Sequence, residues 1–362
     1  MRLVWASVRA VLRSEPGIQE LDVATDDDRQ PSVAVCYPAL AGTCTAGDRV
    51  LLNTTAVELG LGTGGKHFVV ARAGEGSGVA LDKPSGGHIM KLRYSPLQTD
   101  VVSVESPESP AHDAMSVADT LDGMPVVCCG LHSQAVLVAA AIKQANPALK
   151  VAYCMTDGAS LALPLSNVVR EAAQAGLIDA TVACGQAFGG DFEAVNLHSG
   201  LLAARHVVGA QVAIVAIGPG VVGTATPFGH GGVAQGEAVN AVATLDGTPI
   251  CVLRLSFADS RERHRVVSHH TLSALTRVAL APALVAVPEL PAEQAEQVEA
   301  ALEDAGVWRL HRRAPVTATG AVRPNLRGVE VTTMGRRFED DPAFFLAAFA
   351  AGAAAVASRG GA

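Results

Sequence analysis

Two patterns of apolar residues divide the chain. At first, short β-rich runs alternate with turn-forming residues, as at 3–12, 19–24, 32–36, 49–52, 67–71, 88–93 and 101–104. Recurrent short strands with such punctuation are typical of a small β-barrel or sandwich. We therefore predict a β-barrel-like N-terminal domain over residues 1–107.

The pattern changes after a polar segment, residues 108–124, which we expect to be a linker. Beyond it, apolar runs are continuous rather than alternating, which indicates strands buried on both faces of a mainly parallel sheet. We predict a doubly wound α/β ligand-binding domain over residues 125–362. Its expected strands are 126–129, 151–155, 180–184, 212–217, 250–257 and 283–287, with a weaker strand-rich piece near 328–333. Its expected helices lie near 133–144, 165–174, 196–207, 233–242, 268–278, 292–305 and 342–358.

Composition narrows the class of protein. The chain has 362 residues, 49% of them hydrophobic, which is enough to bury a large core. Its 27 basic and 35 acidic residues give a net charge of −8, which argues against nucleic acid as a partner. The seven cysteines include no Cys-x-x-Cys pair and lie mostly in apolar runs, as expected of reduced thiols in a cytoplasmic protein.

Neither end of the chain has the pattern of a membrane segment. Charge interrupts the first residues before a signal-peptide core can form. The alanine-rich run 343–357 is shorter than the roughly 20 residues that a membrane helix needs. We expect a soluble protein without a membrane partner. The final helix suits packing on the body of the protein or on a second subunit, and we expect a homo-oligomer, in the simplest case a homodimer.

Polar residues collect directly after the predicted strands. In an open parallel sheet, ligands bind beyond the carboxyl ends of the strands. The five loops that follow the first five strands would meet at that edge, so we predict a ligand cleft there. Those loops carry His132 and Ser133; Asp157; Gln186 and Asp191; Gly218, Gly220, Gly223, Thr224 and His230; and Asp259, Arg261 and Arg263.

The glycine loop after the fourth strand matches the dinucleotide fingerprint only in its spacing, Gly218-x-Gly220-x-x-Gly223. Pro219 lies inside it, later residues interrupt the expected helix, and no acidic residue ends a strand about 20 residues on. Nicotinamide and flavin are therefore disfavoured as cofactors. A loop whose backbone amides hold a phosphate or carboxylate is favoured over dinucleotide binding, and a tight structural turn is the alternative.

Ser133 lies at a strand-to-helix turn, the place of a nucleophile elbow. The sharp turn of such an elbow needs small residues on both sides of the nucleophile, but here they are Leu131 and Ala135. A helix N-cap is the simpler role for Ser133.

Three further groups of residues leave alternatives open. Asp157 and Asp191, together with histidines at 132, 198, 230, 269 and 270, have the ligand chemistry of a divalent metal site, although no known spacing supports one. Arg261 and Arg263, near Asp259, could bind an anion or form a solvated ion-pair cluster. Glycines near Lys66, Lys91 and Arg93 suit either an anion or an exposed basic hairpin.

Several motifs together resemble a known family. They are Cys36-Tyr-Pro-Ala-Leu, Gly62-Thr-Gly-Gly, Gly87-His-Ile-Met-Lys-Leu-Arg-Tyr, Ala183-Cys-Gly-Gln-Ala-Phe-Gly-Gly-Asp, Arg263-His and Ser268-His-His. Over almost the whole chain, the sequence resembles an uncharacterised bacterial domain-of-unknown-function family, the 3866 family. The resemblance implies a bacterial protein of this length without an assigned activity, so no catalytic residue can be carried over.

Our functional hypothesis is a cytosolic hydrolase or group transferase that acts on a small anionic metabolite. In it, Asp157 or Asp191 with His132 or His230 performs acid–base or metal chemistry. A divalent metal remains open as a cofactor. The alternative is a non-catalytic metabolite-binding or assembly protein that uses the same cleft. The expected ligand-binding residues are Gly218, Gly220, Gly223, Thr224, Ser133, Gln186, Arg261 and Arg263.

Overall fold

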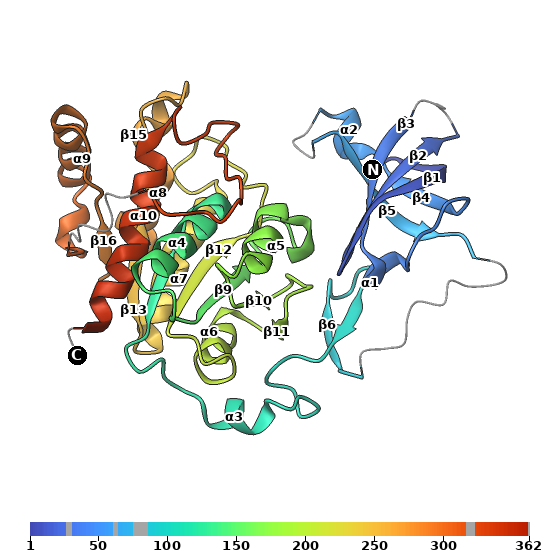
Figure 1. Ribbon diagram of the computed structural model, residues 1–362, viewed down its shortest axis with the longest axis horizontal. Coiled ribbons are helices and arrows are strands. Elements are labelled where there is room, and N and C mark those ends of the chain that lie inside the picture. Colours follow the sequence, from blue (N-terminus) through green and yellow to red (C-terminus); the bar gives the residue numbers. More distant parts are fainter. Residues whose placement is uncertain (27–30, 61–63, 75–85, 316–322, 361–362) are drawn as a thin grey trace. The chain divides into compact units, whose positions relative to one another are not determined.

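A computed structural model of the protein describes residues 1–26, 31–60, 64–74, 86–315 and 323–360 (Figure 1). The chain forms two compact units, Met1–Val102 and Ser103–Ala362, and each is described by itself. Gly62 and Thr63, which begin one of the family motifs, lie outside the described residues.

The first unit contains a closed five-stranded barrel. Its strands are β1 (Leu3–Glu15), β2 (Ile18–Thr25), β3 (Pro31–Cys36), β4 (Arg49–Asn53) and β5 (Lys66–Arg72), with short helices α1 (Pro38–Ala41) and α2 (Thr55–Glu58). They close in the order β1-β2-β3-β5-β4, and the β3–β5 pair is parallel. The barrel interior is filled by alternate residues such as Val8, Leu21 and Leu52, which confirms the predicted β-barrel.

Beyond the barrel, β6 (Ile89–Lys91) and β7 (Thr99–Val101) form a separate two-stranded hairpin. Lys91 on this hairpin is completely buried, so an exposed basic hairpin is the wrong description of this residue. Lys66, on β5, forms an ion pair with Glu20 across the barrel wall.

The second unit is built on an eight-stranded sheet in the order β11-β10-β9-β12-β8-β13-β16-β17, and every neighbouring pair is parallel. This confirms the predicted α/β architecture. The strands are β8 (Pro125–Cys128), β9 (Val151–Thr156), β10 (Ala180–Cys184), β11 (Phe192–Ala194), β12 (Val212–Ile217), β13 (Thr248–Val252), β16 (Leu284–Ala286) and β17 (Arg312–Arg313).

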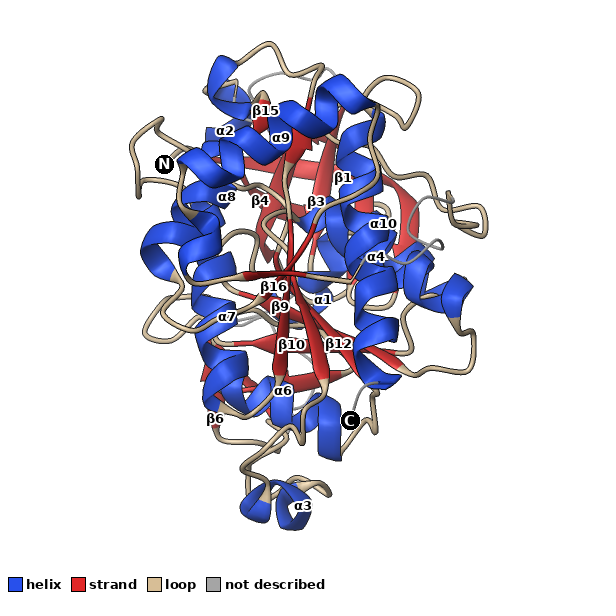
Figure 2. Ribbon diagram, turned by 90° about the vertical axis from the view of Figure 1, so that its left-hand side faces the viewer, coloured by secondary structure: helices blue, strands red, loops and turns tan. Residues whose placement is uncertain are grey.

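Helices cover both faces of the sheet. One face packs against α4 (His132–Ala145), α5 (Asn167–Gln174) and α10 (Pro342–Ala357), and the other against α6 (Leu197–His206), α7 (Ala234–Thr244) and α9 (Ala292–Asp304). Consecutive residues of β8, Val126 and Val127, belong to the cores on opposite faces. Figure 2 shows α4 and α10 on one side of the strands and α7 on the other. Two-sided burial explains why these strands are apolar throughout.

The alanine-rich helix α10 packs on the body of its own unit, against α4. The two helices approach so closely that a Cβ atom on Gly352 would lie 2.6 Å from the Val138 carbonyl oxygen. Among the described residues, no helix combines the length and the apolar character required to cross a membrane.

Three segments differ from the sequence expectation. The expected linker 108–124 contains helix α3 (His112–Val117) and adds Met115, Leu121 and Met124 to the core of the second unit. No strand forms near 328–333 in the part of the chain that the structure describes. The apolar run 250–257 is divided: β13 ends at Val252, and β14 (Leu255–Ser256) pairs with β15 (Val266–Val267) in a separate hairpin.

We predict that Gly200→Ala destabilises the second unit by about 1–3 kcal/mol, the usual cost of overpacking a core. Gly200 faces the sheet from α6, and an added Cβ would overlap the Cys184 sulfur. Urea unfolding measures the change, with the exposed His198→Ala on the same helix as the control. In a Cys184→Ala background the added methyl has room, so the substitution should cost less. If Gly200→Ala lowers the free energy of unfolding equally in the wild-type and Cys184→Ala backgrounds, the contact with Cys184 is not the cause of the destabilisation.

Candidate functional site

The division of the apolar run positions an arginine at the carboxyl edge of the sheet. Arg254 lies between β13 and β14, and its backbone is fixed on both sides. Its carbonyl accepts from the Ser268 N–H at 2.9 Å, and its N–H donates to the Thr271 hydroxyl at 3.1 Å. Ser268 and Thr271 flank the start of α8 (His269–Ser273), which continues into one π-helical turn, η4 (Ala274–Val278). These contacts bring Arg254 beside two consecutive histidines.

Four histidines gather at this point, and we call His230, His264, His269 and His270 the histidine cluster. The His230 and His270 rings stack with centroids 3.9 Å apart and an interplanar angle of 4°. The His270 ring also lies 4.4 Å from that of His269 and 4.8 Å from that of His264. One nitrogen each of His230, His269 and His270 lies within 4.8 Å of the other two, and this trio has the spacing of potential metal ligands.

Hydrogen bonds indicate where the protons lie in the cluster. The Nε2 of His230 is 3.1 Å from the Pro227 carbonyl, to which it donates, so Nδ1 carries the lone pair. The Nδ1 of His270 is 3.2 Å from Arg254 and accepts, since a guanidinium can only donate. The Nδ1 of His264 is 2.7 Å from the Ser268 hydroxyl. Among the described residues, three buried cluster nitrogens have no partner: His230 Nδ1, His269 Nε2 and His270 Nε2.

The rings of the cluster are neutral near pH 7. Burial, helped by His230 and Arg254, lowers the pKa of His270 to about 2. Burial and the charges of Arg254 and Arg261 lower the pKa of His264 to about 3. Burial also lowers the pKa values of His230 and His269. The cluster therefore presents uncharged imidazoles beside a permanent cation.

That cation is Arg254, whose surface is only 6% exposed. Among the described residues, no carboxylate oxygen lies within 4.0 Å of the Arg254 guanidinium, the limit for an ion pair. The guanidinium has one hydrogen bond, to His270. Burial, then the nearby charge of Arg261, lowers the pKa of Arg254 to about 10, so the group stays protonated at neutral pH. Buried charges are normally paired, and this one lacks a direct counter-charge.

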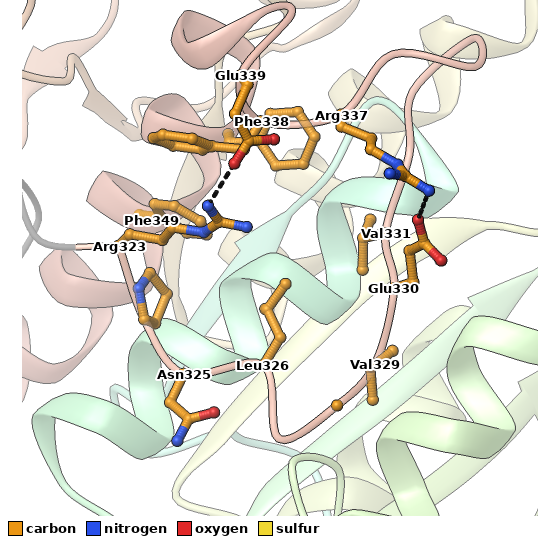
Figure 3. Close-up of a pocket in the computed structure, with 13 residues that line it drawn as sticks. Arg323, Asn325, Leu326, Val329, Glu330, Val331, Arg337, Phe338, Glu339 and Phe349 are labelled. Carbon is orange, nitrogen blue, oxygen red and sulfur yellow. Dashed lines mark hydrogen bonds and ion pairs between the residues drawn. The ribbon is translucent and has the colours of Figure 1, made fainter.

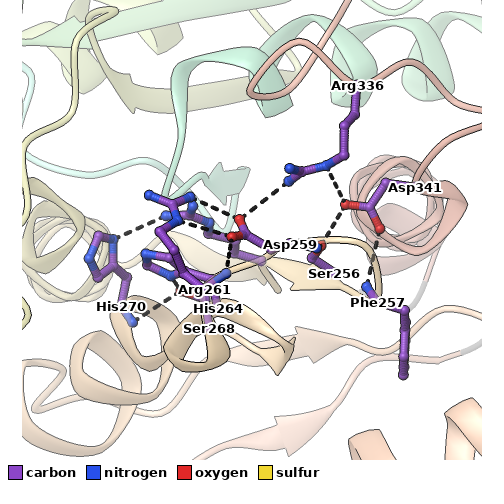
Figure 4. A network of polar contacts seen from close by, with 10 residues as sticks. Ser256, Phe257, Asp259, Arg261, His264, Ser268, His270, Arg336 and Asp341 are labelled. Atoms are coloured by element: carbon purple, nitrogen blue, oxygen red, sulfur yellow. Dashed lines mark hydrogen bonds and ion pairs between the residues drawn. The ribbon is translucent and has the colours of Figure 1, made fainter.

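Asp259, whose charge raises the pKa of Arg254, forms its ion pairs with other arginines (Figure 4). Asp259 is only 3% exposed and accepts a two-pronged contact from Arg261, Nε–Oδ1 at 3.0 Å and Nη2–Oδ2 at 2.8 Å. Arg336 lies 3.3 Å from Asp259 and 3.1 Å from Asp341. Hydrogen bonding from Arg261 holds the pKa of Asp259 well below its usual range. Arg261 could bind an anion or form an ion pair, and the structure shows the ion pair. Arg263 is exposed and has no carboxylate within 4.0 Å among the described residues.

Asp341 anchors the segment before α10 to the β14–β15 hairpin. It is 1% exposed and accepts from the Ser256 hydroxyl at 2.6 Å and the Phe257 N–H at 3.2 Å. Together with Arg336 these donors satisfy the buried carboxylate. The two buried carboxylates of this network, Asp259 and Asp341, are thus matched by Arg261 and Arg336.

The glycine loop after β12 folds back on itself and returns His230 to the sheet. The Thr224 N–H donates to the Gly229 carbonyl at 2.8 Å, and Gly223 forms a bridge with His230. Gly218 permits a close approach to the Ser160 carbonyl, and Gly220 has a positive φ of 92°. Close packing at Gly218 and turn geometry at Gly220 thus account for these two glycines, as expected if the loop is a structural turn.

Of the four residues expected to be catalytic, only His230 lies in the cluster. His132 is held at both nitrogens, 3.1 Å from the Tyr153 hydroxyl and 2.5 Å from the Ser166 hydroxyl. Asp191 accepts from the N–H and the hydroxyl of Thr181, both at 2.8 Å. Asp157 is exposed and accepts from the Gln186 N–H at 2.9 Å. These three side chains make loop-stabilising contacts.

Two glutamines occupy the crevice where the strand order reverses. Chain connections run in opposite directions from β8 and β13, and ligands commonly bind between such strands. Here Gln235 donates to the Cys128 and Val252 carbonyls at 2.8 Å each, and Gln134 donates to the Leu253 carbonyl at 3.1 Å. Gln134 also accepts from the Gly130 and Leu131 amides, so it performs the capping role expected of Ser133. The two glutamine side chains thus fill the crevice between β8 and β13, and the histidine cluster and Arg254 lie beside it.

No functional role was predicted from the sequence for Arg254, His264, Gln134 or Gln235. Arg254 had a usable signal, because a charged residue inside an otherwise apolar run requires a reason for its burial. The two glutamines had none, since their partners are backbone carbonyls of distant strands.

Two cavities lie elsewhere in the second unit. The larger, about 540 Å³, is lined by Phe338, Phe345 and Phe349 and bordered by the ion pairs Arg323–Glu339 and Arg337–Glu330 (Figure 3). The smaller, about 290 Å³, lies beside Phe257 and Leu290. Neither is lined by a histidine of the cluster.

The fold and the site together define a class: a two-unit protein with a small β-barrel and a parallel α/β unit that carries a histidine–arginine site at its carboxyl edge. A family model described as a protein of unknown function, DUF3866, matches residues 33–352, and the chain belongs to this family. Comparison with curated proteins and with solved structures gave no match.

We predict that His132 makes stability depend on pH. Burial lowers its pKa to about 4, below the ordinary value of about 6.5, so folding favours the neutral ring. Its contribution is complete above about pH 6.5 and is lost as the pH falls towards 4, by at most about 3 kcal/mol.

Urea unfolding across this pH range tests the prediction. His132→Phe should show a smaller loss of stability on acidification than the wild type, whatever its stability at pH 7. The exposed His198→Phe should retain the wild-type slope. If His132→Phe has the wild-type slope, another group must be responsible for it.

Proposed function

We propose that the protein is an enzyme that acts, by hydrolysis or group transfer, on a small metabolite bearing a phosphate or carboxylate. One observation carries the proposal: the buried Arg254 guanidinium has no carboxylate within ion-pair distance among the described residues and lies beside a cluster of neutral histidines. An anionic ligand would supply the missing counter-charge.

Arginine suits this role because its remaining N–H groups form a planar fork that matches two oxygens of a phosphate or carboxylate. The nearby Arg263 is exposed and close enough to lower the pKa of Arg254, so the local field is positive. Within an acidic protein of net charge −8, such a positive site favours a small anion over a large polyanion.

The histidine cluster supports chemistry as well as binding. The Nδ1 of His230 is a buried acceptor without a partner among the described residues, available for a proton of substrate or water or for a bound ion. Neutral rings beside a fixed cation can hold an anion without charge repulsion of their own. Hydrolysis or group transfer at a phosphate or carboxyl centre needs these elements: a cation for the oxygens and an acceptor near the attacking group.

A second candidate is a non-catalytic metabolite-binding protein that uses the same site. It is favoured by the contacts of Asp157, Asp191 and His132, which stabilise loops and stand outside the cluster. In this alternative Arg254 still binds the anion, but no turnover follows.

We further infer a cytosolic homo-oligomer. The seven cysteines are all free and buried, which supports a reducing compartment. Val222 and Phe228 on the glycine loop expose apolar side chains, as does Leu280 after η4, and these provide apolar surface for a second copy.

We predict that Arg254→Met weakens anion binding by about 10–100-fold, because hydrogen bonds to a charged group contribute about 1.5–3 kcal/mol. Calorimetric titration of phosphate and of malonate into the protein gives the affinities. Arg312→Met, which removes an exposed arginine on β17, is the control and should bind like the wild type.

Turnover of phosphate monoesters, carboxylic esters and amides by the wild type then separates the two candidate functions. Anion binding through Arg254 without turnover on any of these substrates would support the binding protein. If neither phosphate nor malonate binds, or if Arg254→Met binds them equally well, the proposed anion site is wrong.

A further inference from the structure

The geometry points to a binding site for one divalent cation of the Zn²⁺ class, held by His230, His269 and His270. This inference deepens the proposed function by naming the ion of the same site. Ion binding can be measured without a substrate, so the two proposals can fail separately.

The three rings offer nitrogens that the protein itself leaves unused. His230 and His270 are 3% and 6% exposed, and a buried nitrogen of each has no hydrogen-bond partner among the described residues. His269 contributes a third such atom, Nε2. Leaving buried polar atoms unpaired is costly, and an ion bound by all three nitrogens removes that cost once the His270 ring proton has moved from Nε2 to Nδ1.

The distances are close to those of a zinc site. One nitrogen from each ring lies within 4.8 Å of the others. Three nitrogens bound tetrahedrally at about 2.0–2.1 Å from one ion lie roughly 3.3 Å apart. Moving each nitrogen by about 1 Å would bring the trio to this spacing. Because the His230 and His270 rings are stacked with an interplanar angle of 4°, one of them must also turn out of the stack before both in-plane lone pairs meet at one ion.

The surroundings of His230 are those of a metal ligand. Metal-binding histidines usually donate their second N–H to a carbonyl or carboxylate, which fixes the tautomer and directs the lone pair at the ion. His230 donates Nε2–H to the Pro227 carbonyl at 3.1 Å, so its Nδ1 is already the ligand form.

Two glycines keep the approach to the nitrogens open. A Cβ on Gly223 would lie 3.1 Å from His270 Nε2, and a Cβ on Gly232 would lie 3.1 Å from His230 Nδ1. Side chains at these positions would occupy the space in front of two of the ligand atoms.

His270 couples the ion to Arg254. While Arg254 donates to Nδ1 of His270, the ring proton is on Nε2. Ion binding at Nε2 moves that proton to Nδ1 with no net change in charge, and two donors then face each other. Arg254 must therefore release His270, and its guanidinium becomes free for the anion.

Three histidine ligands leave one tetrahedral position for water or substrate. Zinc lowers the pKa of a bound water to about 7 and so provides a nucleophile near neutral pH. The freed Arg254 would hold the anionic group of the substrate beside that water. Ion and arginine together account for the hydrolytic class of the proposed function.

The test is calorimetric titration of Zn²⁺ and Co²⁺ into the untagged full-length protein after removal of metal by chelator, with Co²⁺ absorption reporting tetrahedral nitrogen ligands. The wild type and the exposed control His198→Ala should each bind one ion per chain. His230→Ala should lose at least about 100-fold in affinity, more than loss of an outer-shell contact costs. Circular dichroism checks that the variants remain folded.

Two further variants keep all three ligands in place. Gly223→Ala should weaken the ion through steric crowding, and its φ does not require glycine. Arg254→Met should bind the ion more tightly, because it removes both a repelling charge and the competing hydrogen bond to His270. A merely structural role of these residues would not strengthen ion binding.

The inference is overturned if the wild type binds no ion, or if His230→Ala and Gly223→Ala bind it as the wild type does. Unchanged or weaker binding by Arg254→Met overturns the coupling. Phosphate binding through Arg254 without any ion would leave the proposed anion site intact, whereas ion binding without an anion would overturn that site alone.

Discussion

The arrangement at the carboxyl edge depends on one buried positive charge. Arg254 is buried where β13 ends two residues earlier and the β14–β15 hairpin begins. Hydrogen bonds with Ser268 and Thr271 fix its backbone there. Removing a cation from water costs several kcal/mol unless something compensates. The surrounding groups adjust to it: the histidines are neutral, and Asp259 is shared by Arg261 and Arg336. Arg254, which has no carboxylate within ion-pair distance among the described residues, marks the candidate site.

Much of the fold followed from local pattern. Continuous apolar runs located β8, β9, β10 and β12 to within about one residue, because burial on both faces of a parallel sheet affects every residue of a strand. The pattern did not predict the structure where contacts with residues far away in the sequence determine it. Residues 250–257 are apolar on both sides of the break at Arg254, and the polar segment 108–124 packs through only a few residues, such as Leu121 and Met124.

The site was harder to infer. The rule that ligands bind beyond strand ends predicted His230 and the arginine-rich loop at the carboxyl edge of the sheet, where the structure has them. It could not separate residues that face a ligand from residues that hold loops together, since both are polar and follow strands. His132 and Asp157 have partners 34 and 29 residues away, and no local spacing reveals such contacts. Arg254 was assigned to a strand because its neighbours in sequence are apolar, although its charge within that run was a usable signal.

The pairing of α10 with α4 also affects how the protein is made. The buried face of α4, at residues 132–145, is covered by a helix that begins at residue 342. During synthesis from the N-terminus, about 200 residues must follow α4 before its cover exists, at roughly 5–20 residues per second. For that interval of tens of seconds the nascent chain presents Val138 and Ala141 to solvent or to a chaperone. Completion of this unit is therefore a late event in translation, and a chain that ends before residue 342 would have an uncovered core.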